Sequence, residues 1–225
     1  MTRTLPDATT FIRANLRPGP APMLPEISLY QAHPGSGLAR LGRAPYWAHV
    51  WAGGAALARH FLQNPGTVRG LRVLDLGAGS GVVGIAAAQA GAAQVICAET
   101  DPFARAAIAL NAALNSVQIE VMAGDVTALP PLDVDLIAAG DVFYSADLAA
   151  HMTAYLGSCH AAGVSILVGD PGRAFLPRHC LQPMAEYPVR DFGQGANAAP
   201  TRGAVFTFAP PADLSSGAAK AGLAH

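Results

Sequence analysis

The sequence has no hydrophobic run long enough to cross a membrane, although 52% of its residues are hydrophobic. A membrane-spanning helix needs about 20 consecutive apolar residues, and the apolar stretches here are shorter. The first residues, MTRTLPDATTFIRANL, also contain no long apolar segment of the kind that secretion signals carry. The 225 residues therefore predict one soluble domain of ordinary size with no membrane partner.

Charge of one sign and cysteine are also scarce. The formal net charge is −1, so we expect no broad electrostatic binding of nucleic acid. The 3 cysteines, Cys97, Cys159 and Cys180, form no C-x-x-C pair, which is typical of free thiols in a reducing cytoplasm. The histidines show no metal-ligand spacing and the motif G-x-S-x-G is absent, so neither a metal site nor a serine hydrolase is expected.

What the sequence does have, from residue 71 onward, is an alternation of short apolar runs with alanine-rich stretches of helical spacing. We predict strands at 71–76, 93–99, 117–123, 133–140 and 164–170, and helices at 82–91, 102–114 and 146–161. Unbroken apolar strands that alternate with helices are typical of a parallel sheet covered on both faces. The stretches EYPVRDF and GAVFTFAP have no helix between them and predict a closing antiparallel pair. The expected fold class is α/β, a doubly wound and mostly parallel seven-stranded sheet.

The first third of the chain has a different pattern. Asp7 is the expected N-cap of a short helix that ends near Leu16. Proline does not continue a helix, so the proline-rich stretch 17–26 is expected to be an extended connector. A short strand is predicted at 27–32, and a helix in WAGGAALARHFLQN, which ends before Pro65.

The stretch VLDLGAGSGVVG contains two overlapping glycine patterns. Gly79, Gly81 and Gly84 spell the dinucleotide-binding pattern G-x-G-x-x-G, whereas Gly77 begins a second pattern that follows the acid Asp75. Both patterns let a cofactor approach the backbone after the first strand. A carboxylate beside this loop is unfavourable near a pyrophosphate and favourable near a cationic amino group. S-adenosylmethionine carries an ammonium and a sulfonium and no phosphate, so the second pattern favours it.

Two further acids follow the next two strands. Glu99 ends the second strand, where a carboxylate can bind both hydroxyls of a ribose. Asp125 follows the third strand, where a side chain can reach an adenine amino group. Each acid could instead be a solvated loop residue. Together with Asp75 and the glycine turn they favour S-adenosylmethionine as the cofactor.

At this point the chain resembles a known family. VRGLRVLDLGAGSG is similar to the motif of the seven-β-strand (class I) methyltransferases, which implies a Rossmann-like fold. LPEISL, PYWAHVWAGGAALARHFLQNP, ETDP, GDVFYSADLA and VGDPGR narrow the resemblance to the electron-transfer flavoprotein β-subunit lysine methyltransferases. It covers the chain from about Pro25 to Phe208. Related enzymes often carry W-P-G-G where this chain has W-A-G-G at 51–54.

The resemblance and the composition together suggest three parts of the chain. Residues 1–66 are expected to form an N-terminal extension that acts as a lid or substrate segment. Residues 67–210 are expected to form the S-adenosylmethionine-binding methyltransferase core. Residues 211–225 are small and polar, and are expected to be disordered.

The stretch DVDLIAAGDVFY places Asp141 and Tyr144 at the carboxyl end of the fourth strand, beside the switch point where ligands bind. The resemblance implies that this D-x-x-Y pair meets the substrate nitrogen, with Asp141 also beside the cofactor. A lysine has a pKa near 10.4, and only its neutral amine can attack a methyl group. Asp141 could orient the incoming ammonium. The alternative roles are a helix N-cap for Asp141, which Ser145 would fill better, and a core position for Tyr144.

Tyr46, Trp47 and Trp51 form an aromatic cluster before the first core helix. Aromatic faces attract a methylated ammonium by cation–π interaction, but such a segment could also simply pack over the end of the sheet. The resemblance implies that Trp51 lies near the cofactor. In GDPGR, Asp170 could face the substrate entrance and Arg173 could meet an acidic patch on a protein partner, although turn formation would also explain this motif.

The leading hypothesis is an S-adenosylmethionine-dependent protein-lysine N-methyltransferase. The resemblance alone implies the target, the β-subunit of electron-transfer flavoprotein. Within the same class, a ribosomal-protein lysine or a small-molecule amine are the alternatives. Outside it, the alternatives are a dinucleotide oxidoreductase and a catalytically silent cofactor-binding module.

Overall fold

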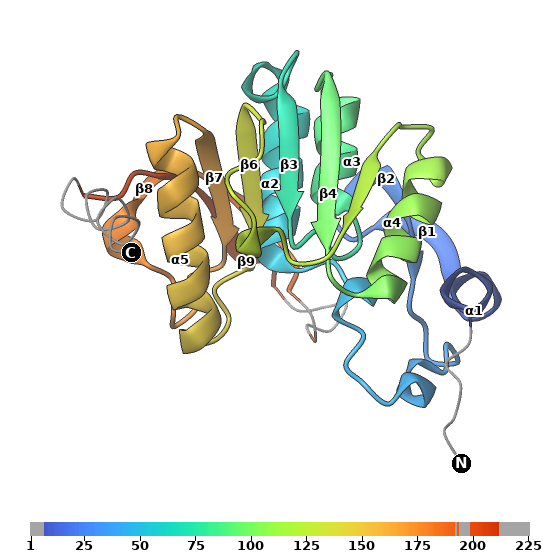
Figure 1. Cartoon of the computed structure of the whole chain (residues 1–225). Coiled ribbons are helices and arrows are strands. Elements are labelled where there is room, and N and C mark those ends of the chain that lie inside the picture. Colours follow the sequence, from blue (N-terminus) through green and yellow to red (C-terminus); the bar gives the residue numbers. More distant parts are fainter. Residues whose placement is uncertain (1–6, 192, 194–198, 212–225) are drawn as a thin grey trace, which may run out of the picture.

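The computed structural model describes residues 7–191, 193 and 199–211. Its centre is a seven-stranded sheet in the order β5-β4-β3-β6-β7-β9-β8 (Figure 1). Five strands are parallel: β3 (Arg72–Leu76), β4 (Gln94–Glu99), β5 (Glu120–Ala123), β6 (Leu136–Gly140) and β7 (Ser165–Asp170). The last two, β8 (Leu181–Val189) and β9 (Thr201–Phe208), are antiparallel to their neighbours. The predicted fold class and the closing antiparallel pair are confirmed.

Helices cover both faces of the sheet. Helices α2 (Ala52–Gln63), α3 (Val82–Gln89) and α4 (Pro102–Leu114) lie on one face, and α5 (Ala146–Ala161) lies on the other (Figure 1). Successive strand residues point to opposite faces. Val73 therefore joins the core beneath α2 and α3, whereas Leu74 joins the core beneath α5.

The strand order places a topological switch point between β3 and β6. After β3 the chain runs outward to β4 and β5, and it then returns to β6 on the other side of β3. The carboxyl ends of these parallel strands share one edge, which is the lower edge in Figure 1. In open α/β sheets this crevice is where ligands bind.

The segment before the sheet begins with α1 (Ala8–Asn15), and the Asp7 carboxylate accepts a hydrogen bond from the Thr10 N–H at 2.7 Å, which confirms the expected cap. The proline-rich segment is not a free connector. It forms β1 (Arg17–Ala21), which pairs antiparallel with β2 (Leu24–Gln31). Proline lacks an N–H, but a two-stranded ribbon has outer edges on which none is needed.

Glycines allow α2 to lie directly on the sheet backbone. A Cβ on Gly53 would lie 2.1 Å from the Gly169 carbonyl oxygen, and one on Gly140 would lie 2.9 Å from the Cα of Gly54. Gly53 and Gly54 lie in the first turn of α2, while Gly140 and Gly169 lie at the carboxyl ends of β6 and β7. The N-terminus of α2 is thereby brought to the switch point.

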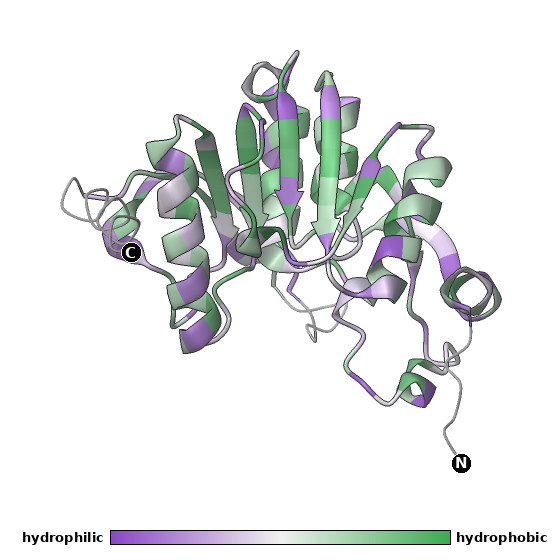
Figure 2. Cartoon of the chain, in the orientation of Figure 1, coloured by the Kyte–Doolittle hydropathy of each residue, from purple (hydrophilic) through white to green (hydrophobic). Residues whose placement is uncertain are grey.

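Apolar residues are concentrated in the central strands and on the helix faces that contact them (Figure 2). None of the helices in the described part of the chain combines the length and the hydrophobicity that a membrane crossing requires. The expected tail, 211–225, lies outside the described residues apart from Pro211.

Candidate functional site

A pocket of about 580 Å³ lies at the carboxyl ends of the parallel strands. Its volume is within the range of roughly 300–1,000 Å³ that small-molecule and cofactor sites occupy. Seven of the residues predicted from the sequence line it: Trp51, Gly77, Gly79, Glu99, Asp125, Asp141 and Tyr144. The other two, Asp75 and Gly81, do not.

The glycine loop after β3 has the left-handed backbone that glycine favours, with φ of 69° at Gly77, 53° at Gly79 and 80° at Gly81. Gly77 and Gly79 present their backbone to the pocket. Gly81 is the N-cap of α3, and a Cβ there would meet Ile108 at 3.3 Å. Gly81 is therefore needed for packing between α3 and α4, and its contact with a cofactor stays a prediction.

Asp75 lies behind the loop. Its side chain is buried, and Oδ2 accepts the Gly84 N–H at 2.9 Å and lies 3.7 Å from the Cys97 thiol. Burial raises the pKa of Asp75 to about 7. Asp75 thus points from the sheet face toward the N-terminus of α3, and its contact with the ammonium of a cofactor stays a prediction.

Glu99 sits at the end of β4 with its carboxylate held by the backbone. Oε2 accepts the Gly79 N–H at 2.9 Å, and Oε1 accepts the N–H groups of Thr100 at 2.8 Å and Asp101 at 3.0 Å. The Thr100 hydroxyl also donates to Oε1 at 3.4 Å, so the carboxylate, which offers about four acceptor positions, has four donors around it. Glu99 therefore connects the glycine loop to the loop after β4, and its binding of ribose hydroxyls stays a prediction.

Asp125 follows β5, the strand next to β4, and lines the pocket. Its Oδ1 accepts hydrogen bonds from the N–H and the hydroxyl of Thr127, and these bonds lower the pKa of this carboxyl. Thr127 in turn lies within hydrogen-bond distance of His151 from α5. Asp125 is thus an exposed, ionised carboxylate at the pocket rim, and its contact with an adenine stays a prediction.

Asp141 has a backbone φ of 57°, which is unusual for a residue other than glycine. Its Oδ2 accepts a hydrogen bond from the Gly54 N–H of α2 at 2.8 Å. Its Oδ1 accepts two hydrogen bonds from Arg173, one from Nε at 3.1 Å and one from Nη2 at 2.6 Å. Burial raises the pKa of Asp141 to about 6, while Arg173 and the Gly54 N–H act in the opposite direction. Ser145 caps α5 through Leu148, as expected, so Asp141 is free of that role.

The loop after β7 differs from the prediction. Asp170 does not face the substrate entrance: its side chain is buried, and Oδ1 accepts the N–H groups of Gly172 at 2.6 Å and Arg173 at 2.7 Å. Arg173 points into the pocket toward Asp141. The pattern GDPGR therefore forms a turn that presents an arginine to the site.

The aromatic residues divide into two groups. Trp47 is buried and stacks on Phe103, with ring centroids 6.1 Å apart. Tyr46 and Tyr144 are 63% and 62% exposed, and their rings lie 6.5 Å apart. Trp51 is next to Tyr46 at 5.8 Å and beneath the Arg173 guanidinium at 5.6 Å. An aromatic rim made of Tyr46, Trp51 and Tyr144 thus surrounds the pocket opening beside Asp141.

Two contributions to the site were missed in the sequence. The first is the Gly53–Gly54 doublet, whose lack of side chains lets α2 reach Asp141; the doublet at the start of a predicted helix was the available signal. The second is Asp191, which lies 3.5 Å from Arg173. Asp191 comes from a segment after β8 for which the sequence carries no local signal.

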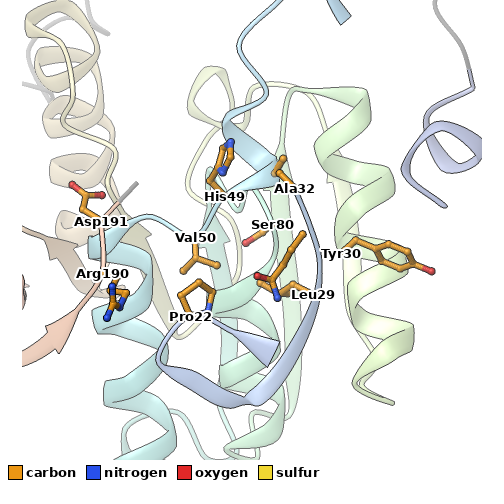
Figure 3. Close-up of a pocket in the computed structure, with 11 residues that line it drawn as sticks. Pro22, Leu29, Tyr30, Ala32, His49, Val50, Ser80, Arg190 and Asp191 are labelled. Atoms are coloured by element: carbon orange, nitrogen blue, oxygen red, sulfur yellow. The ribbon is translucent and has the colours of Figure 1, made fainter. Parts of the chain in front are cut away.

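A smaller cavity of about 160 Å³ lies on the other side of the segment that precedes α2. The β1–β2 hairpin lines it with Pro22 and Leu29, and His49 and Val50 face it from the segment (Figure 3). Asp191 borders it as well. The segment between Tyr46 and Trp51 therefore forms a wall between the two cavities, and only the larger one has the volume of a cofactor site.

Comparison with known proteins agrees with this geometry. The model of a family described as lysine methyltransferase matches residues 42–175. The electron transfer flavoprotein beta subunit lysine methyltransferase of Rattus norvegicus is 40% identical over 172 residues, which is 74% of this chain and 68% of that protein. The corresponding protein of Xenopus laevis is 41% identical over 172 residues, with 74% and 70% covered.

The fold has relatives among solved structures as well. A Pyrococcus horikoshii protein assigned as an RNA methyltransferase superposes with a TM-score of 0.52. The two are 18% identical, and the match covers 68% of this chain and 81% of that one. At this identity the likeness concerns the fold alone, and it agrees with a Rossmann-like methyltransferase architecture.

Proposed function

This chain belongs to the lysine methyltransferase family, and we propose that it transfers the methyl group of S-adenosylmethionine to a lysine amine of a protein substrate. The observation that carries this proposal is the pocket itself. It joins a glycine loop, two carboxylates at the ends of β4 and β5, and the Asp141–Tyr144 pair at the switch point.

The pocket residues fit S-adenosylmethionine. Gly77 and Gly79 leave the backbone accessible on the β3 side, because even a Cβ built at either position would lie no closer than 3.7 Å to a neighbouring atom. Glu99 and Asp125 would hold the ribose and the adenine, and Trp51 would lie beside the reactive end. When bound, S-adenosylmethionine supplies an electrophilic methyl group on a sulfonium sulfur, and the sulfur keeps the electron pair when that methyl group leaves.

The chain's own residues have to deliver a neutral amine. Removing the proton from a lysine of pKa 10.4 at pH 7 costs about 4–5 kcal/mol. Asp141 would accept a hydrogen bond from the amine and align its lone pair, and the proton would leave to water. Alignment of two reactants supplies a large part of the rate enhancement in such a displacement. The aromatic rim (Tyr46, Trp51 and Tyr144) would accept the hydrocarbon stem and the methylated ammonium.

We infer that the protein substrate is the β-subunit of electron-transfer flavoprotein. The two relatives described above are named as lysine methyltransferases of that subunit. We also infer a cytoplasmic location, which the 3 free cysteines support. A net charge of −1 supports the further expectation that no nucleic acid is bound.

The test is a labelling assay with methyl-labelled S-adenosylmethionine. Wild-type protein and Asp141→Asn are incubated with purified electron-transfer flavoprotein and with a lysate from cells that lack this enzyme, and labelled lysines are identified by mass spectrometry. We expect label on the β-subunit with the wild type and a loss of at least about 100-fold with the variant. Calorimetry should show cofactor affinity within a few-fold of wild type, because Glu99, Asp125 and the glycine loop are intact.

The matched control is Asp147→Asn, which removes an exposed acid near the site that does not line the pocket. It should methylate like the wild type. Label on another protein alone, such as a ribosomal protein, would replace the proposed substrate, and label on small molecules alone would contradict a protein-lysine activity. An Asp141→Asn protein with normal turnover would contradict the role of Asp141.

A further inference from the structure

Arg173 is the one arginine or lysine among the described residues that line the pocket. Its guanidinium lies between the Trp51 ring, at 5.6 Å, and the Asp141 carboxylate. Its side chain is 23% exposed, whereas that of Asp141 is 9% exposed. The negative charge that an incoming lysine meets is therefore already paired with a positive charge from within the chain.

The hydrogen bonds of Asp141 limit what it can still accept. Oδ1 receives two N–H groups from Arg173, and Oδ2 receives one from Gly54. Of about four acceptor positions on a carboxylate, one position on Oδ2 is left. One N–H of a substrate nitrogen could occupy it without displacing any existing partner.

We propose that Arg173 is a positioning residue for methyl transfer, which holds Asp141 with one acceptor position free and offsets its charge, so that a substrate lysine is bound as the neutral amine. This inference rests on the proposed lysine methylation. An unpaired buried carboxylate would form an ion pair with the lysine ammonium and stabilise the unreactive form. A neighbouring cation has the opposite effect and lowers the pKa of an amine.

The other charged groups around this pair lie behind it. Asp170, at the end of β7, contacts the Gly172 and Arg173 N–H groups, and Asp191, after β8, lies 3.5 Å from Arg173. Neither one lines the pocket. On the pocket side, partial burial of the Tyr144 phenol raises its pKa, with smaller contributions from Tyr46 and from the charge of Glu99. The other titratable side chains that line the pocket, besides Asp141 and Arg173, are Tyr46, Glu99, Asp101, Asp125 and His151.

The loop is also built to hold Arg173 in place. The Asp170 carboxylate accepts a 2.7 Å hydrogen bond from the Arg173 N–H. This bond fixes the backbone of the turn from which the Arg173 side chain extends. Two planar N–H groups then reach one oxygen of Asp141, a geometry that lysine cannot reproduce. The arginine thus fixes orientation as well as charge.

The test compares the pH dependence of kcat for wild type, Arg173→Gln and Arg173→Lys, with purified electron-transfer flavoprotein as substrate. The kcat profile reports the ionisation of the bound complex. In Arg173→Gln the rising limb should move to higher pH by about one unit, which lowers the rate at pH 7.5 by about tenfold. Arg173→Lys keeps the charge, so its limb should return toward the wild-type position.

Arg178→Gln is the matched control, because Arg178 lies on the same loop, contacts the Gly172 carbonyl at 3.5 Å and does not line the pocket. The rising limb of its kcat profile should coincide with that of the wild type. Melting temperatures should show that all variants fold. If Arg173→Gln lowers kcat equally at every pH, so that the rising limb of the pH profile stays where it is in the wild type, Arg173 has only a structural role and the proposal is wrong.

A second readout needs no substrate and separates this inference from the proposed function. Carbon-13 NMR of the aspartate carboxyl carbons follows the titration of Asp141 directly. Arg173 lowers the pKa of Asp141, so Arg173→Gln should raise it and Arg178→Gln should not. If the Asp141 titration is the same in both variants, the pairing proposed here is wrong, whichever protein the enzyme methylates.

Discussion

Backbone N–H groups hold the carboxylates that matter at this site. Glu99 accepts three of them, Asp141 accepts one from α2, and Asp170 accepts two from its own turn. Backbone donors are fixed by the fold, so these side chains keep their orientation whether or not a ligand is present. Such preorganisation is what a site needs in order to align reactants.

At the residue scale, Asp75 allows a prediction about pH. Burial raises its pKa to about 7 from an ordinary value of 3.8, so the folded state binds this proton more tightly than the unfolded chain does. The stability from protonated Asp75 is complete below pH 4 and is lost as the pH rises toward 7. Asparagine cannot ionise, and its Oδ1 can still accept the Gly84 N–H.

Thermal denaturation of wild type and Asp75→Asn between pH 5 and pH 8 tests this. The wild-type melting temperature should fall relative to the variant by at least about 3 °C over that range. Other titrating groups, Asp141 among them, are shared by both proteins and cancel in the comparison. Asp133→Asn is the control, because the Asp133 side chain is 91% exposed. Its melting temperature should change with pH in the same way as that of the wild type. Parallel curves for Asp75→Asn would contradict the buried, protonated carboxyl.

Most residues of the pocket were predictable because they follow strand ends, and parallel strands bring their carboxyl ends to one edge. The contact of Asp75 with α3 could not be predicted, because only the alternation of side chains along β3 decides that Asp75 points to the face that α3 covers. The role of Arg173 also could not be derived, because its partners Asp141 and Asp191 come from other parts of the chain.

At the element scale, the contact of α2 with the sheet depends on glycine. A Cβ on Gly53 would lie 2.1 Å from the Gly169 carbonyl oxygen, and this backbone atom cannot move aside. Gly53→Ala should therefore lower the stability by about 1–3 kcal/mol or more, and it should lower methylation because α2 would carry the Gly54 N–H away from Asp141. Melting temperature and the labelling assay measure the two effects.

Gly157→Ala is the matched control within α5, because no atom lies within 4 Å of the Cβ that it adds. Alanine is the better helix former by about 1 kcal/mol, so this variant should melt at the same or a higher temperature and stay active. Equal stability of Gly53→Ala and wild type would mean that α2 can shift on the sheet, and the proposed link between helix position and Asp141 would fail.

The elements that strong periodicity and capping residues mark were predicted well. The helices at 102–114 and 146–161 agree with α4 and α5 to the residue. The strand predicted at 27–32 overlaps β2, but β1 and its pairing with β2 were missed, because the prolines of β1 leave neither an alternating pattern nor an apolar run in the sequence. β2 also packs below α3 and α4 through Leu24, Ile27 and Leu29, which are long-range contacts.

At the scale of the whole molecule, the N-terminal residues are joined to the pocket through a shared apolar cluster. Phe11 and Ile12 of α1 pack in one cluster with Trp47 and Phe103. Trp47 is also part of the pocket lining, and Arg43 pairs with Asp101 at 2.7 Å. Residues 1–66 were predicted to act as a lid or substrate segment, and this cluster is the physical route by which they could respond to a bound cofactor.

Hydrogen exchange tests that route. A ligand that holds Trp47 in place should reduce the opening of the cluster behind it, because local stability follows from buried contacts. We expect S-adenosylmethionine to slow amide exchange in α1 as well as in the glycine loop at 77–81. The end of α5 around Leu156 and Cys159 belongs to a different cluster on the other sheet face and should change much less. Protection confined to the loop would show that α1 moves independently of the pocket, and the N-terminal segment would then be a scaffold for the fold rather than a cofactor-linked lid.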